Sequence, residues 1–360
     1  MKECKRRSVL QEGDRMSFVF EVSHEDIKRL DAVQLTKILS KLLYLESDKY
    51  GIAQSCASCS LNITVSDGGE DGLVKWEGGP ANTDWFKSRY NLFQCKATNM
   101  SAGACKNEIL YNDSGTLKLK PMVERAFDNN GCYILFYYDA LSPIGEKERI
   151  DKIREGLKEV GKSYWNIVEI YIYDANRIAA WVNNYISVII DVLRYNRISI
   201  PENLLMWEEW NGYEKHNRYT FETDSILIGY IKQLRDHFSS ENQIARIVGA
   251  SGLGKTRLAL ETFREDNDYD SRVLSKKVVY IDASSTGAKS IISLVIGLRR
   301  RNISGIIVVD NCSLKLHKKL VNEINNNSKL SLLTIDYVYE EIATNYPLIE
   351  LKAVSTDVIK

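Results

Sequence analysis

The segment 249-GASGLGKT-256 constrains this chain more than any other feature of its sequence. It matches the pattern G-x-x-x-x-G-K-[ST], with an apolar run, 244-IARIV-248, before it and a helical pattern after it. Three glycines let the backbone curl so that its N–H groups point at phosphate oxygens. These are Gly249, Gly252 and Gly254. Lys255 supplies a positive charge for the β- and γ-phosphates, and Thr256 offers a hydroxyl to Mg²⁺. The motif therefore predicts an ATP-binding P-loop.

Regular alternation of apolar runs and helical patterns surrounds this motif from about residue 220 onward. Five such runs with helical crossovers predict a doubly wound, five-stranded parallel sheet. The runs are 244–248, 278–282, 305–310, 331–336 and 348–354. We therefore assign residues 223–360 to a P-loop NTPase core.

The acid that pairs with a P-loop is expected at the end of another buried strand. Asp310, in 306-IIVVDNCS-313, has this position and is expected to hold the nucleotide's Mg²⁺ through water. Asn311 stands where many ATP-hydrolysing proteins carry a second acid. An amide can hold a water molecule but cannot accept its proton, so slow hydrolysis or a switch role is expected. Asp336 closes the next strand and either approaches the γ-phosphate or is an ordinary loop residue.

The first part of the chain has a less regular pattern that predicts a mixed α/β domain. Apolar positions within 25–46 form a helical stripe. Strands are expected at 61–66, 92–97, 131–140 and 166–175, and helices at 145–160 and 176–193. We assign residues 1–205 to this domain and 206–222 to a connector.

A second group of polar residues lies in this first domain. Asp71 ends the acidic turn 66-SDGGEDG-72, and Gln94 and Lys96 share one face of a strand because they are two residues apart. An acid, an amide carbonyl and a lysine on one surface are what metal-dependent phosphodiester hydrolysis needs. Asp71 and Gln94 are predicted to bind Mg²⁺, and Lys96 is predicted to stabilise the negative charge of the reaction. The alternative is an ordinary polar hairpin.

Three further acids are candidates for the same site. Asp67 and Glu70 compete with Asp71 for the metal role, because the turn holds three acids in five residues. Glu46 continues the helical stripe, so it is expected on the buried edge of its helix with a cation or metal partner. The alternative for Glu46 is a solvated helix end.

Charge and cysteine content exclude several classes of protein. Lys plus Arg number 48 and Asp plus Glu number 48, so a nucleic-acid surface has to be a local patch. The apolar runs are far shorter than the roughly 20 residues of a membrane helix, and the basic start is no secretory signal.

Seven cysteines indicate reduced thiols in the cytoplasm. Cys56 and Cys59 form a C-x-x-C pair that Cys95 and Cys105 could complete as a zinc site, although buried thiols are the main interpretation.

These motifs together resemble a known family. The pattern D-G-G-x-D-G followed by Q-x-K resembles the Mrr-type branch of the PD-(D/E)xK restriction-endonuclease-like nucleases, with Gln94 in place of the more usual acid. This likeness covers roughly residues 20–200. Combined with 248-VGASGLGKTRLALE-261, it is similar to the antiviral STAND NTPases (Avs) of bacteria. The stretch 173-YDANRIAAWVN-183 also resembles a segment of that family.

The resemblance implies an Mg²⁺-dependent double-stranded DNA endonuclease that acts in antiphage defence. ATP binding would assemble a homo-oligomer, a tetramer on activation, after a phage protein is recognised by a C-terminal repeat region that this chain lacks. The resemblance also implies that the P-loop core at 223–360 is of the STAND type and is incomplete at its C-terminal end. The chain is therefore expected to be an N-terminal fragment or to have its sensor elsewhere. Two alternatives remain: a modification-dependent restriction endonuclease with a nucleotide-driven motor, and a nucleotide-switch scaffold with an inactive nuclease domain.

Overall fold

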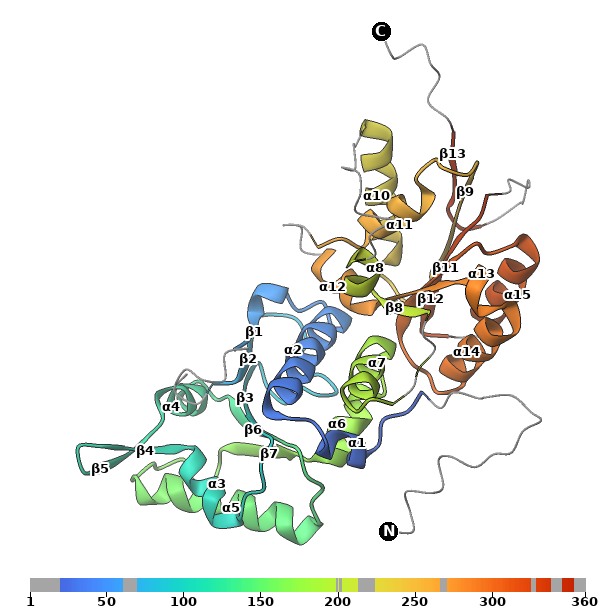
Figure 1. The fold of residues 1–360 in the computed structure, drawn as a ribbon. Helices are drawn as coiled ribbons and strands as arrows, with labels where there is room; N and C mark the ends of the chain where they lie inside the picture. The colour runs from blue at the N-terminus through green and yellow to red at the C-terminus, as the bar shows by residue number, and fades with distance from the viewer. Residues whose placement is uncertain are drawn as a thin grey trace, which may run out of the picture.

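The computed structural model shows a mixed α/β protein with two large sheets and one small two-stranded ribbon (Figure 1). The structure describes residues 20–60, 70–198, 200, 203–212, 224–265, 271–324, 328–337 and 345–352. The strand expected at 61–66 lies outside these residues. None of the described helices is both long and apolar enough to cross a membrane.

The first sheet has five strands in the order β1-β2-β3-β6-β7. The strands are β1 (Ala57–Cys59), β2 (Gly72–Lys75), β3 (Tyr90–Lys96), β6 (Cys132–Tyr137) and β7 (Glu169–Tyr173). β1, β2 and β3 pair antiparallel, whereas β3, β6 and β7 pair parallel. The parallel pairs require crossover connections, and helices supply them.

Helices cover both faces of this sheet because each face is apolar. On one face, α2 buries the predicted stripe, including Leu35 and Leu39, against Phe93 of β3. On the other face, Ile153 and Leu157 pack with Leu92 and its neighbours. The helices of the first face are α1 (His24–Lys28) and α2 (Ala32–Lys49), and those of the second are α3 (Ala102–Glu108), α4 (Pro121–Asp128) and α5 (Pro143–Glu159).

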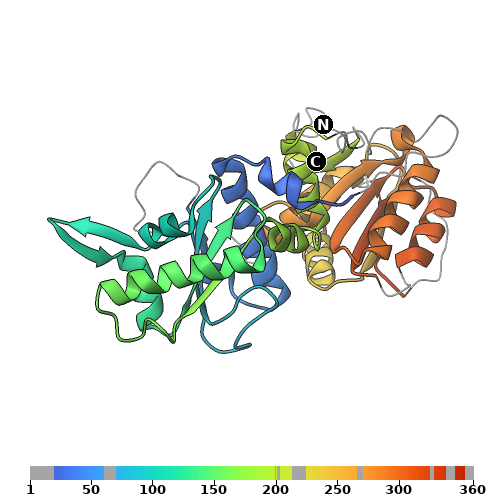
Figure 2. The same cartoon turned by 90° about the horizontal axis from the view of Figure 1, so that it is seen from below.

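A two-stranded ribbon extends from the second face, well away from the body (Figures 1 and 2). It consists of β4 (Leu110–Asp113) and β5 (Thr116–Leu119), which pair antiparallel. Ser114 and Gly115 form the turn with φ of 52° and 89°, the positive values that a tight hairpin requires. The apolar pattern of the sequence did not predict this ribbon, because nearly all of its side chains are exposed.

The second sheet has the order β13-β9-β12-β11-β10-β8. Its five predicted strands are all present and pair parallel. They are β9 (Ile244–Gly249), β10 (Val278–Asp282), β11 (Gly305–Asp310), β12 (Leu330–Ile335) and β13 (Leu348–Leu351). A sixth strand, β8 (Leu204–Met206), pairs antiparallel with β10 at the edge. Residues that the sequence placed at the end of the first domain and in the connector thus belong to the second sheet.

Helices also cover both faces of the second sheet. Leu258 and Phe238 pack on one face, and Val295 and Leu320 pack on the other. The first face carries α8 (Trp207–Gly212), α10 (Ser225–Phe238), α11 (Lys255–Thr262) and α12 (Ser271–Lys277), and the second carries α13 (Ala283–Thr286), α14 (Ala288–Arg300) and α15 (Leu314–Ile324). This is the doubly wound arrangement that the alternating pattern predicts.

The helix expected at 176–193 is two helices, α6 (Ala175–Val182) and α7 (Ile186–Tyr195). The break is where the chain bonds to the second sheet: Ser304 N donates to Asn184 O at 2.7 Å, and Ile186 N donates to Ser304 O at 3.1 Å. Gly305 allows this close approach, because a Cβ there would lie 2.4 Å from Ile186 Cγ2. One apolar core therefore continues from the first sheet through α7 to the second sheet.

Candidate functional site

The predicted P-loop joins β9 to the N-terminus of α11. Gly249, Gly252 and Gly254 have φ of 144°, 83° and 82°, a region that side chains with a Cβ rarely adopt. Gly249 also has no room for a Cβ, which would lie 2.4 Å from the carbonyl oxygen of Leu351 on β13. The backbone therefore needs glycine where the phosphate-binding motif has it.

The structure brings Thr256 and Asp310 into direct contact beside this loop. Thr256 Oγ1 donates to Asp310 Oδ2 at 2.7 Å, and Tyr280 Oη donates to the same oxygen at 3.1 Å. Lys255 Nζ donates to Ala250 O at 2.8 Å, and burial lowers the pKa of this lysine while Asp310 partly opposes the shift. The hydroxyl and carboxylate that a P-loop protein offers to the magnesium of a nucleotide thus lie together, and the lysine begins α11 with its amine bonded to the loop.

Two residues near this site have partners of their own. Asn311 Nδ2 donates to Asp282 Oδ1 at 2.8 Å, at the ends of two adjacent strands. Asp336 forms a buried ion pair with Arg246, with 2.9 Å between Oδ2 and Nη2. Asp336 is therefore engaged inside the sheet, which agrees with a structural role for this acid. The sequence did not single out Asp282 or Arg246.

In the first sheet, the structure brings together Asp71 and Gln94. Asp71 Oδ2 accepts hydrogen bonds from Gln94 Nε2 at 2.5 Å and from the backbone N–H of Cys95 at 2.6 Å. The antiparallel pairing of Gly72 with Phe93 places the two residues side by side. The acid and the amide that sequence reasoning selected thus form one hydrogen-bonded unit.

Two buried oxygen atoms beside this unit have no hydrogen-bond partner among the described residues: Gln94 Oε1 and Tyr133 Oη. The Gln94 residue is 5% exposed and Tyr133 is fully buried. Burial raises the pKa of Tyr133, and nearby Glu108 and Asp71 add to the effect. Leaving a buried polar atom unpaired costs about 1–3 kcal/mol, so such atoms commonly mark the place of a water or an ion.

The donor set around Gln94 agrees with a magnesium site. A carboxylate and an amide carbonyl are the hard oxygen ligands that Mg²⁺ prefers, and Mg²⁺ keeps several waters, so two protein ligands are enough. Among the described residues, no group of three or more His, Cys, Asp or Glu side chains could hold a metal ion. Of the competing acids, Asp67 lies outside the described residues, and Glu70 Oε1 accepts a hydrogen bond from Ser58 at 3.3 Å.

Lys96 has a partner that sequence reasoning missed. Its Nζ lies 2.7 Å from Oε2 of Glu108, the last residue of α3. Lys120 Nζ lies 4.0 Å from the same oxygen. Gln94 and Lys96 are on the face of β3 that α3 covers, as the two-residue spacing predicts. No periodic signal in the sequence indicates that Glu108 would reach this face.

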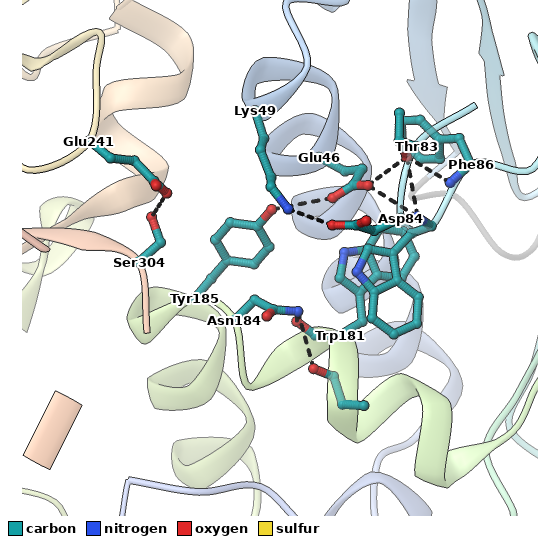
Figure 3. A network of polar contacts seen from close by, with 12 residues as sticks. Glu46, Lys49, Thr83, Asp84, Phe86, Trp181, Asn184, Tyr185, Glu241 and Ser304 are labelled. Atoms are coloured by element: carbon teal, nitrogen blue, oxygen red, sulfur yellow. Dashed lines mark hydrogen bonds and ion pairs between the residues drawn. The ribbon is translucent and has the colours of Figure 1, made fainter. Parts of the chain in front are cut away.

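Glu46 belongs to a polar network that also includes Thr83 and Tyr185 (Figure 3). It is fully buried and accepts hydrogen bonds from Thr83 Oγ1 at 2.5 Å, from Trp85 N at 3.1 Å and from Tyr185 Oη at 3.4 Å. Burial raises its pKa, and these bonds only partly oppose the effect. The predicted buried position is therefore present. Its hydrogen-bond partners are neutral groups, and the nearby cation Lys49 also lowers its pKa.

Glu46 and Asp71 have different hydrogen-bond partners. Gly72, the neighbour of Asp71, lies beside Leu43, one turn of α2 before Glu46. The hydrogen bonds of Glu46 nevertheless come from Thr83, Trp85 and Tyr185, whereas those of Asp71 come from Gln94 and Cys95. The structure thus does not bring Glu46 together with Asp71 and Gln94.

The cysteines have the character of buried thiols. Burial raises the pKa of Cys59 to about 12 and that of Cys95 still further. Cys105 is fully buried in the core on the opposite face of the sheet, where burial also raises its pKa. Cys59 and Cys95 pack on the first face of the sheet, so the four cysteines do not come together as one zinc site among the described residues.

Comparisons with known proteins add little to this geometry. No family model matches the chain, and no curated protein matches it. Among solved structures, PCH-2 of C. elegans is similar with 11% sequence identity and a TM-score of 0.28, over 41% of this chain and 47% of that chain. This chain thus spans less than half the length of PCH-2. A likeness of this size carries no argument about activity.

Proposed function

We propose that this chain joins an ATP-binding P-loop unit to an Mg²⁺-dependent endonuclease that cuts double-stranded DNA in antiphage defence. The observation that carries the nuclease half is the buried, unpartnered Oε1 of Gln94, hydrogen-bonded through its amide to Asp71 and two residues from Lys96. The observation that supports the nucleotide half is the contact of Thr256 with Asp310 beside three glycines of positive φ.

In this proposal, Asp71 and Gln94 hold Mg²⁺, and the backbone N–H of Cys95 fixes the orientation of the Asp71 carboxylate. The ion would lower the pKa of a bound water and polarise the phosphodiester. Lys96 places a positive charge where the attacked phosphate gains negative charge, which lowers the barrier to hydrolysis.

The nucleotide half regulates assembly in this proposal. Lys255, Thr256 and Asp310 bind ATP with Mg²⁺, and Asn311 supplies no base, so ATP persists and acts as a switch. ATP-bound copies associate into a tetramer after a phage protein is recognised. Association raises the effective concentration of the nuclease units to the millimolar range, so that two active sites can act on the two strands of one duplex.

The test is plasmid cleavage by the full chain fused to a tetramerising helix, with ATP and Mg²⁺. We expect linear and nicked DNA from the wild-type fusion and none from Lys96→Ala or Asp71→Asn. Lys75→Ala is the matched control, because this exposed lysine lies on the neighbouring strand β2. Cleavage by both site variants at the wild-type rate would refute the assignment.

A second candidate function is a nucleotide switch whose first unit is catalytically silent. The ion pair of Lys96 with Glu108 favours it, since the lysine is already neutralised by a protein carboxylate. ATP-dependent assembly of the wild-type fusion without any DNA cleavage would support this candidate over the first.

A further inference from the structure

Two lysines converge on one carboxylate oxygen beside the proposed nuclease site. Lys96 Nζ lies 2.7 Å and Lys120 Nζ lies 4.0 Å from Oε2 of Glu108. The three side chains are 25%, 24% and 20% exposed, respectively, so water screens this cluster less than it screens surface charges. Two cations and one anion leave a net positive charge at this place.

Separate elements fix the three members of the cluster. Lys96 ends β3, and Glu108 ends α3. Lys120 follows β5 and precedes Pro121, the first residue of α4. The backbone N–H of Lys120 donates to Ile109 O at 2.8 Å, which ties Lys120 to the residue after Glu108. The position of Lys120 therefore does not depend on its own ion pair.

The cluster has the chemistry of a phosphate subsite occupied by a protein anion. A carboxylate and a phosphodiester carry the same single charge and present oxygen atoms that accept from ammonium groups. Lys96 also links the cluster to the catalytic residues, because it lies two residues from Gln94. We propose that Lys96 and Lys120 together bind one phosphate of the DNA backbone, and that Glu108 occupies this subsite until DNA replaces it.

This inference rests on the proposed nuclease function and adds a substrate-binding residue, Lys120, to it. The DNA phosphate and the Glu108 carboxylate compete for the same two cations. Removing the charge of Glu108 should therefore raise the affinity for DNA, whereas removing Lys120 should weaken the binding of one backbone phosphate. The two substitutions have opposite effects on binding.

The experiment measures binding of a fluorescent 20-base-pair duplex to the full chain in EDTA, at a series of salt concentrations. We expect Lys120→Ala to weaken binding severalfold and to reduce the slope of log K against log salt by at most about 0.9, the value for losing the phosphate contact entirely, because Lys96 still contacts that phosphate. Lys118→Ala is the matched control on the same ribbon, because Asp113 already pairs with this exposed lysine at 2.7 Å. Glu108→Gln should bind more tightly than wild type.

Cleavage by the tetramer-fused chain gives the second measurement. Glu108→Gln is expected to lower KM without lowering kcat, and Lys120→Arg is expected to restore what Lys120→Ala loses. If Glu108→Gln instead reduces kcat as Lys96→Ala does, with unchanged binding, then Glu108 only positions Lys96 and the subsite is refuted. Circular dichroism of Lys120→Ala identifies a folding defect, and Lys120→Gln then takes its place.

The outcomes separate this inference from the proposed function. A wild-type chain that cuts DNA, with Lys120→Ala and Lys118→Ala indistinguishable in affinity and salt slope, refutes the subsite alone. A wild-type fusion that neither binds nor cuts duplex DNA refutes the nuclease function and the subsite together.

Discussion

Replacing Asp71 by alanine should damage the fold as well as the proposed chemistry. Both hydrogen bonds of its Oδ2 atom, from Gln94 Nε2 at 2.5 Å and from Cys95 N at 2.6 Å, would be lost. The amide of Gln94 would then lose this bond at its nitrogen, while its oxygen already has no partner among the described residues. The backbone N–H of Cys95 would also be left without this acceptor.

The expected magnitude follows from these two bonds. A hydrogen bond to a charged group contributes about 1.5–3 kcal/mol, so two contribute at most about 6 kcal/mol. Asp71 is only partly buried, so water can replace part of the lost hydrogen bonding. We therefore expect Asp71→Ala to lower the free energy of unfolding by about 3 kcal/mol. Asp71→Asn keeps an oxygen at the Oδ2 position that can accept both bonds, and its loss should be about 1 kcal/mol.

Urea unfolding of the wild type and the two variants tests this. With a slope near 3 kcal/mol per molar urea, Asp71→Ala should lower the midpoint by about 1 M. Asp71→Asn should lower it by about a third of that while still abolishing cleavage, which makes it the better inactive variant. Equal losses in the two variants, or a loss below about 0.5 kcal/mol for alanine, would refute the argument from hydrogen bonding.

Three further predictions concern other buried or charged groups. Burial raises the pKa of the Glu46 carboxyl above 4.5 in the folded state. The folded state therefore holds the carboxyl proton more tightly than the unfolded state does. The free energy of unfolding should fall as pH rises from 4.5 through the raised pKa. Glu46→Gln should flatten that fall in urea titrations from pH 4.5 to 8, and an unchanged profile would contradict the assignment. Lys255→Ala should weaken binding of a labelled ATP analogue at least about tenfold, because charge-assisted bonds to phosphate are lost; equal binding by wild type and variant would rule out the P-loop interpretation. Asp336→Ala should lower the free energy of unfolding by about 3–5 kcal/mol, since it leaves Arg246 buried without its carboxylate. A measured loss under about 1 kcal/mol would show that the pair contributes little.

The P-loop half could be predicted from the sequence because its signals are local. The glycine spacing determines the loop, and the apolar runs determine strands that are buried on both faces. Asp310 follows from the rule that parallel strands end at the same edge of the sheet. The contact of Asp71 with Gln94 could also be predicted, because a single antiparallel pairing of neighbouring strands places the two residues side by side.

Contacts between distant segments could not be predicted in this way. The ion pair of Lys96 with Glu108 depends on how α3 folds over the sheet, and no periodicity reports that. The helical stripe correctly predicts that Glu46 is buried, but a stripe does not tell which polar groups lie opposite it. The break at Asn184 could not be predicted for the same reason, because its hydrogen-bond partner, Ser304, lies far along the chain, just before β11 of the other sheet.

The position of α7 has a consequence for work with parts of this chain. All but the last of its apolar residues are buried, with α2 on one side and the second sheet on the other. A helix with so many apolar residues is stable only when its apolar surface is covered. A truncated polypeptide ending near residue 205 would leave one side of α7 in water, including Ile186 beside the missing Gly305. Such a patch promotes aggregation, so the two halves are best purified as one piece, with substitutions rather than deletions used to silence either of them.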